Sequence, residues 1–162
     1  MDSQGGMWLG TFYGGLNYYH PLKNRFQNIR SIPKTNSLNS NIIGCIKEDK
    51  HKKLWIGTNN GGLNFYDPQT CQFVHYTRKD GLASNDVKAI YVDEAQNLVY
   101  IGTHTGGLSI LHRNSGRIET FNQRATRNIY DIEPAINGDL WLTGMTVLLR
   151  FDTRQKTFTR VT

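Results

Sequence analysis

The stretch Leu54-Trp55-Ile56-Gly57-Thr58-Asn59-Asn60-Gly61-Gly62-Leu63 contains a phrase that recurs along this chain of 162 residues. The other copies are Trp8-Leu9-Gly10-Thr11, Tyr100-Ile101-Gly102-Thr103 and Trp141-Leu142-Thr143-Gly144. The aromatic residues that open the copies, at positions 8, 55, 100 and 141, are 47, 45 and 41 residues apart. This spacing is typical of four-stranded propeller blades. Repetition therefore indicates the architecture before any single residue is interpreted.

Each copy of the phrase lies within a unit that follows a four-strand plan, of which the first unit keeps only the last three strands. In the second unit, 42–46 is a short apolar run and 54–58 is rich in β-forming residues. Residues 63–66 alternate in polarity, and 71–76 form the fourth strand. The intervening residues 59–62, Asn-Asn-Gly-Gly, tolerate positive φ, as a tight hairpin requires. The unit is therefore expected to be an antiparallel meander.

The whole chain, residues 1–162, is predicted to be one all-β propeller segment of about four blades. Complete blades are expected at 41–76, 86–121 and 128–161, and a partial blade with only its last three strands at 7–30. Because the repeats begin in the middle of a unit, we interpret the chain as an excised part of a larger, otherwise closed propeller. An incomplete propeller has open end sheets, which favour self-association, and we expect a homodimer of the isolated segment.

The residues that recur in every unit are interpreted as framework, because they serve every unit equally. The aromatic residues pack between sheets and the glycines allow turns. This framework set comprises Trp8, Trp55, Tyr100, Trp141, Gly57, Gly102, Gly61, Gly62, Gly106 and Gly107. Ligand binding should instead depend on positions that differ between units.

Alternating strand direction predicts which positions those are. The turns between second and third strands share one face with the crossings from blade to blade. We expect any pocket at the mouth of the central channel to draw on that face. The candidate ligand-binding residues are Phe12, Tyr13, Asn59, Asn60, Arg78, Asn85, His104, Thr105 and Arg127.

Composition narrows the class of protein further. The net charge of +6, from 19 basic and 13 acidic residues, favours acidic partners without specifying one. The basic residues are dispersed, and we expect neither a nucleic-acid partner nor membrane contact. The chain shows no signal peptide and no apolar run long enough to span a membrane. Cys45 and Cys71, expected on the first and last strands of one blade, are predicted to be free thiols.

No pattern of catalytic, metal or cofactor chemistry is found. The glycine-rich turn at 57–62 lacks the lysine of a phosphate loop and leads into a strand. The five histidines show no metal-ligand spacing, so we expect no metal and no cofactor. Asp49, Asp93 and Asp139 recur in the turns between first and second strands, where turn hydrogen bonding is expected.

The string Asp80-Gly81-Leu82-Ala83-Ser84-Asn85-Asp86-Val87, with Ile101-Gly102-Thr103 and Gly106-Gly107-Leu108, resembles the two-component regulator propeller repeat. The resemblance implies the extracytoplasmic sensor region of a hybrid two-component histidine kinase and response regulator. It implies a periplasmic segment without catalysis of its own, which binds a small molecule or oligosaccharide and regulates the transcription of glycan-utilisation genes by phosphorelay. The parent protein is then a histidine kinase, and the neighbouring blades of that protein are partners of this segment.

Two alternatives stay open at this point. The chain is a propeller lyase or hydrolase if His104 and a carboxylate converge at the channel mouth. It is a protein-interaction scaffold if the blades serve only as a docking surface. Fold alone does not decide among these functions.

Overall fold

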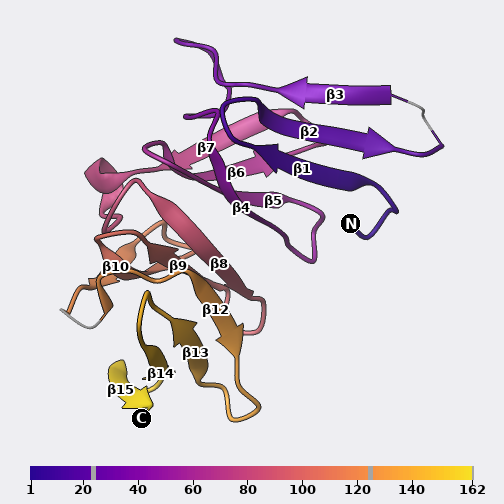
Figure 1. Ribbon diagram of the computed structural model, residues 1–162. Coiled ribbons are helices and arrows are strands. Elements are labelled where there is room, and N and C mark those ends of the chain that lie inside the picture. The colour runs from indigo at the N-terminus through magenta and orange to yellow at the C-terminus, as the bar shows by residue number, and fades with distance from the viewer. Residues whose placement is uncertain (23–24, 124–125, 162) are drawn as a thin grey trace.

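The computed structural model describes residues 1–22, 25–123 and 126–161, which form four antiparallel sheets arranged side by side (Figure 1). The first sheet contains β1 (Met7–Thr11), β2 (Gly15–His20) and β3 (Arg25–Ile29). The second contains β4 (Ile43–Glu48), β5 (Leu54–Thr58), β6 (Gly62–Asp67) and β7 (Gln72–Tyr76). The third contains β8 (Val87–Asp93), β9 (Leu98–Thr103), β10 (Gly107–His112) and β11 (Ile118–Phe121). The fourth contains β12 (Asp131–Pro134), β13 (Leu140–Thr143), β14 (Leu148–Asp152) and β15 (Thr157–Val161). A short 3-10 helix, η1 (Arg78–Asp80), precedes the third sheet. The predicted fold class, an incomplete β-propeller, is confirmed.

The repeated phrase forms the hairpin at the centre of each complete sheet. In the second sheet Thr58 pairs with Gly62, and the Thr58 hydroxyl donates to the Gly62 carbonyl at 2.9 Å. Asn60 and Gly62 have φ of 62° and 78°. A Cβ at position 62 would lie 2.3 Å from the carbonyl oxygen of Tyr76. Gly62 is therefore required both by its backbone conformation and by its neighbour.

Successive sheets meet through their first strands. β4 lies beside β8, and β8 lies beside β12 (Figure 1). Gly57 allows this approach, because a Cβ there would lie 2.5 Å from Cγ1 of Val87 in the next sheet. We call the three interfaces between consecutive sheets the first, second and third joints, in chain order.

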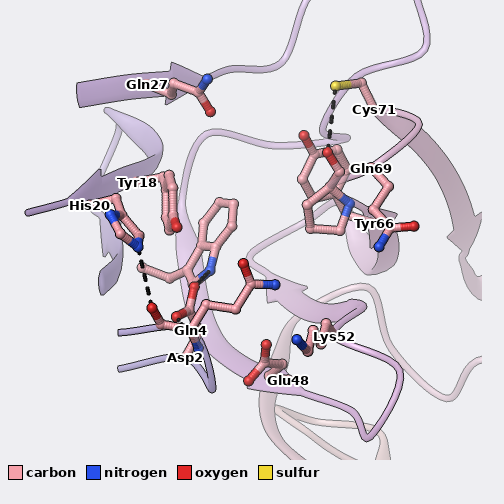
Figure 2. Close-up of a pocket in the computed structure, with 12 residues that line it drawn as sticks. Asp2, Gln4, Tyr18, His20, Gln27, Glu48, Lys52, Tyr66, Gln69 and Cys71 are labelled. Atoms are coloured by element: carbon pink, nitrogen blue, oxygen red, sulfur yellow. Dashed lines mark hydrogen bonds between the residues drawn. The ribbon is translucent and has the colours of Figure 1, made fainter. Parts of the chain in front are cut away.

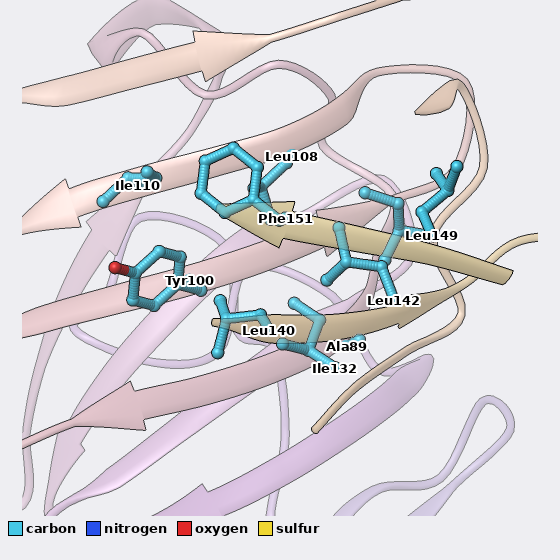
Figure 3. Packing of buried hydrophobic residues seen from close by; sticks show 10 residues of the cluster. Ala89, Tyr100, Leu108, Ile110, Ile132, Leu140, Leu142, Leu149 and Phe151 are labelled. Atoms are coloured by element: carbon cyan, nitrogen blue, oxygen red, sulfur yellow. The ribbon is translucent and has the colours of Figure 1, made fainter. Parts of the chain in front are cut away.

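Each joint contains its own hydrophobic cluster. The first joint buries Leu16, Leu54 and Tyr66, and the second buries Trp55 and Val87 among others. At the third joint, Tyr100 of β9 packs with residues of β13 and β14 (Figure 3). Trp55 is 2% exposed and Tyr100 1% exposed, whereas Trp141, in the equivalent position of the last sheet, is 37% exposed. The aromatic residue of the phrase is thus buried by the following sheet.

Asparagine residues fix the crossings between sheets. The carbonyl of Asn85 accepts from the Gly62 N–H at 2.8 Å, and its side-chain oxygen accepts from the Arg78 N–H at 2.8 Å. Asn41 repeats both contacts one sheet earlier, with Gly15 at 2.9 Å and Ser31 at 2.7 Å. The crossing is therefore tied to the hairpin of the preceding sheet.

Both cysteines are free thiols. Cys45 lies on β4, as expected, and burial raises the pKa of its thiol to about 12. Cys71, expected on the fourth strand, lies instead in the turn before β7 with φ of 57°. That prediction was wrong because position 71 corresponds to Gly116, which has φ of 71° in the equivalent turn of the third sheet. No helix within the described residues has the length and apolar character to cross a membrane.

Candidate functional site

The face that carries the β1–β2, β5–β6 and β9–β10 turns and the crossings between sheets is called the crossing face. The structure places the sequence-predicted ligand residues in these turns and crossings. Phe12 and Tyr13 lie in the first turn, Asn59 and Asn60 in the second, and His104 and Thr105 in the third. Arg78 and Asn85 lie in the crossing after β7, and Arg127 in the crossing after β11.

Four polar side chains form a continuous network on this face, across the second joint. Asn59 Oδ1 accepts from Lys88 Nζ at 2.8 Å, and Lys88 Nζ lies 2.9 Å from Asp86 Oδ1. Asp86 Oδ2 lies 3.3 Å from His104 Nδ1. The network joins the β5–β6 turn to the β9–β10 turn, and thus holds two predicted ligand residues in fixed positions.

Exposed aromatic side chains lie at the β1–β2 turn. Phe12 is 71% exposed and Tyr13 64% exposed. Their rings pack edge to face with centroids 4.6 Å apart. Such a pair offers apolar surface that is already ordered, which is the kind of surface on which sugar rings stack.

Some of the remaining predicted ligand residues have structural roles, and others have exposed side chains. Asn85 has a structural role, because both its carbonyl and its side chain hold the crossing. Thr105 donates its N–H to the Asn128 side chain at 3.0 Å. Asn60, Arg78 and Arg127 have exposed side chains in the same turns and crossings. They remain available to a ligand.

The His104–Asp86 pair meets the geometric condition for the enzyme alternative, since the two side chains lie within reach of each other. Asp86 also pairs with Lys88, which ties its carboxylate into the network described above. No group of three or more metal-ligating side chains is found within the residues that the structure describes.

A cavity of about 520 Å³ lies at the first joint, on the face opposite the crossing face (Figure 2). Trp8, Tyr18 and Tyr66 supply its aromatic wall, and Asp2, Glu48 and Lys52 supply charged groups. None of the nine predicted ligand residues lines this cavity. The expectation for a pocket at the mouth of the central channel stays a prediction, because this cavity forms elsewhere, where the turns of two adjacent sheets leave space between them.

Sequence reasoning missed the residues of this cavity. The signal was present in the alignment of the repeats, in the turn between the third and fourth strands. That turn carries Pro68 in the second unit and Arg113 in the third. Arg113 fills the space beside Trp55 of the preceding unit, whereas Pro68 leaves the space beside Trp8 open.

Comparison with known proteins gives a consistent result. The family model described as two component regulator propeller matches residues 37–60. No curated protein sequence matches the chain. The WD40 repeats of RRP9 superpose with a TM-score of 0.75 at 10% identity, covering 96% of this chain and 47% of that one, and this likeness shows the fold alone.

Two solved extracellular domains from B. thetaiotaomicron are more similar. One, described as that of the hybrid two-component system BT3049, has a TM-score of 0.86 and 28% identity, covering 97% of this chain and 22% of that one. The other, described as that of the hybrid two-component system BT4673, has a TM-score of 0.81 and 27% identity, covering 99% and 24%. The chain thus spans less than a quarter of the length of either relative. Residues 37–60 thus match the two-component regulator propeller repeat, and nearly the whole chain is similar to part of the extracellular domains of hybrid two-component systems.

Proposed function

We propose that this chain is a ligand-sensing propeller segment of a hybrid two-component sensor and that it recognises an oligosaccharide. The observation that carries the proposal is the similarity of nearly the whole chain to extracellular domains of such systems. The segment then lies in the periplasm, and the kinase and response regulator belong to other parts of the parent protein. Ligand binding would act on transcription of glycan-utilisation genes through phosphorelay.

The crossing face is the surface on which we place the oligosaccharide. Phe12 and Tyr13 present apolar rings, and the side chains of Asn60 and Arg127 are exposed in neighbouring turns and crossings. Sugar recognition commonly combines aromatic faces with a few polar groups that fix orientation. These positions also differ between the repeats, unlike the framework residues.

Isothermal titration calorimetry of the chain against neutral and acidic oligosaccharides tests this function. We expect at least one glycan to bind, and Phe12→Ala to weaken its binding at least about tenfold through loss of the stacking surface. Phe26→Ala is the matched control, because Phe26 is 74% exposed on β3, outside the crossing face. Absence of binding to the whole panel, or equal effects of the two substitutions, would contradict the proposal.

Acid–base catalysis is a second candidate function, favoured by the 3.3 Å approach of His104 Nδ1 to Asp86. It predicts that a bound glycan is cleaved and that His104→Ala stops the cleavage without preventing binding. Chromatography of the glycan after prolonged incubation separates the two functions. An intact glycan supports sensing alone.

A further inference from the structure

The first and second joints are built from equivalent residues. Asp2 precedes Trp8 by six positions, as Asp49 precedes Trp55. The Asp2 carboxylate accepts from the backbone N–H groups two and four residues further on, at 3.0 and 2.7 Å. Asp49 accepts from the corresponding groups at 2.9 and 3.0 Å. The two aspartates therefore hold the same turn in successive sheets.

A glutamate faces each of these turns, but from a different position in its unit, since Glu48 precedes Asp49 whereas Glu94 follows Asp93. Glu48, at the end of β4, accepts from the Ser3 N–H across the first joint at 2.9 Å. Glu94, just after β8, accepts from the Lys50 N–H across the second joint at 2.9 Å. Each joint thus places an aspartate, a glutamate and a tryptophan around one space.

At the second joint this space is filled by the guanidinium of Arg113. Its Nη2 lies 2.6 Å from Asp49 Oδ2, and its Nη1 lies 2.9 Å from Glu94 Oε2. Its central carbon lies 5.6 Å from the centre of the Trp55 ring, within the range of a cation–π contact. The Arg113 side chain is only 13% exposed, and the Asp49 side chain is fully buried. Burial of Glu94 opposes ionisation, but the Lys50 N–H and the Arg113 charge outweigh it and lower the pKa of Glu94.

At the first joint the same space is the cavity of about 520 Å³ (Figure 2). Pro68 stands at the position of Arg113 and supplies no charge. Within the described residues, no cationic group lies within 4.0 Å of the Asp2 or Glu48 carboxylate. Burial and the negative charges of Asp2 and Glu48 raise the pKa of Tyr18, which lines the cavity. The cavity therefore keeps two carboxylates without an arginine beside them; Asp2 Oδ2 accepts from the Trp8 indole N–H and Glu48 Oε1 from the Ser3 hydroxyl, and each oxygen can accept a second hydrogen bond.

We propose that the cavity at the first joint binds a guanidinium group, carried either by a small molecule or by an arginine side chain of another chain. The carboxylates of Asp2 and Glu48 accept its N–H groups, and Trp8, Tyr18 and Tyr66 provide aromatic surface. Lys52 and His20 also line the cavity, where they would attract an anionic group of the same ligand. This site is independent of the oligosaccharide proposed for the crossing face.

Titration of the chain with methylguanidinium, followed by NMR, tests the site. The Trp8 indole N–H donates to Asp2 at 3.0 Å, so its resonance, assigned with Trp8→Phe, reports on the cavity. We expect this resonance to shift and to saturate at a concentration on the order of millimolar, as for other very small ligands. The Trp55 resonance should not move, because Arg113 already fills its joint. The neutral isostere N-methylurea should leave both resonances unchanged.

Four variants make the test specific. Glu48→Gln keeps an acceptor for the Ser3 N–H and should weaken binding at least about tenfold, because a charge-assisted contact is lost. Asp2→Asn should weaken binding similarly, but its NH2 group replaces the oxygen that accepts from the Trp8 indole N–H, so binding to this variant is followed at the Tyr18 ring resonances. Glu133→Gln, on β12 of the fourth sheet, is the control with the same change in net charge and should bind normally. Pro68→Arg should fill the cavity as Arg113 fills its own, and abolish binding while the circular dichroism spectrum stays that of the parent chain.

The source of the guanidinium is distinguished by a blocked Gly-Arg-Gly peptide. Tighter binding of this peptide than of methylguanidinium indicates an arginine side chain, and equal or weaker binding indicates a small molecule. The proposal is overturned if the Trp8 resonance does not respond to methylguanidinium, if N-methylurea shifts it equally, or if Pro68→Arg and Glu48→Gln bind like the parent chain.

Discussion

Gly57 shows how a single residue sets the distance between two blades. A methyl group at this position would meet Cys45 Sγ and Val87 Cγ1, each at 2.5 Å. Gly10 and Gly102 are in the same situation against Ile43 and Ile129. The glycine of the repeated phrase is therefore a condition for packing each first strand against the preceding sheet.

Gly57→Ala is expected to destabilise the chain by about 1 to 3 kcal/mol, the usual cost of overpacking a close contact. Urea denaturation measures the change. Val87→Ala removes one of the two colliding atoms, so the double variant should lose less stability than the sum of the single variants. Strict additivity of the two changes would show that Gly57 acts through some other contact.

Three hairpin turns of the crossing face share one backbone conformation at their second turn residue, but each has a different amino acid at that position. Tyr13, Asn60 and Thr105 take the same turn position with φ of 72°, 62° and 66°. Asparagine tolerates this left-handed region, whereas a β-branched threonine is strained there. Two of the three turns therefore carry a residue that stability alone would not favour, as is common at functional positions.

Exchange of these residues tests the strain. Thr105→Asn should raise the free energy of unfolding by roughly 0.5 to 1 kcal/mol, and Asn60→Thr should lower it by a similar amount. Urea denaturation measures the free energy of unfolding of both variants. If both substitutions leave stability unchanged, the turns adjust their backbone and store no strain.

Sequence reasoning was most successful for these elements, because hairpins depend on local signals. The run Asn59-Asn60-Gly61-Gly62 and the polarity of the flanking strands indicate β5 and β6 directly. The cavity at the first joint was not predictable in the same way. It depends on contacts between residues far apart in the sequence, such as Ser3 with Glu48, which are 45 positions apart, and on the presence of proline instead of arginine at position 68. The position of Cys71 was missed for a local reason, since cysteine gives no sign of a left-handed turn.

At the scale of the whole molecule, the first and last sheets each present an uncovered apolar surface. Leu9 of β1 is 44% exposed, and Trp141 and Leu148 of the fourth sheet are 37% and 41% exposed. The equivalent tryptophan Trp55, covered by the next sheet, is 2% exposed. The apolar surface that is buried between adjacent sheets is therefore exposed on the outer sides of the first and last sheets.

We expect the isolated chain to self-associate through these surfaces, with a second copy as the partner. Sedimentation equilibrium at micromolar concentrations should show dimers, and Trp141→Lys should shift the population toward monomer. Leu22→Lys is the control, since Leu22 is 90% exposed in a turn rather than on an end sheet. A monomer at all concentrations, or equal effects of the two lysine substitutions, would refute this assembly.

The contrast between the filled second joint and the hollow first joint has a mechanical consequence. Arg113 joins the second and third sheets, because its guanidinium forms ion pairs with Asp49 of one sheet and Glu94 of the other. At the same place in the first joint, the two sheets are separated by the cavity. We therefore expect the first joint to bend more readily than the second. We expect a ligand bound in that space to restrict this bending, so that occupancy of the cavity would limit how far the first two sheets move relative to each other.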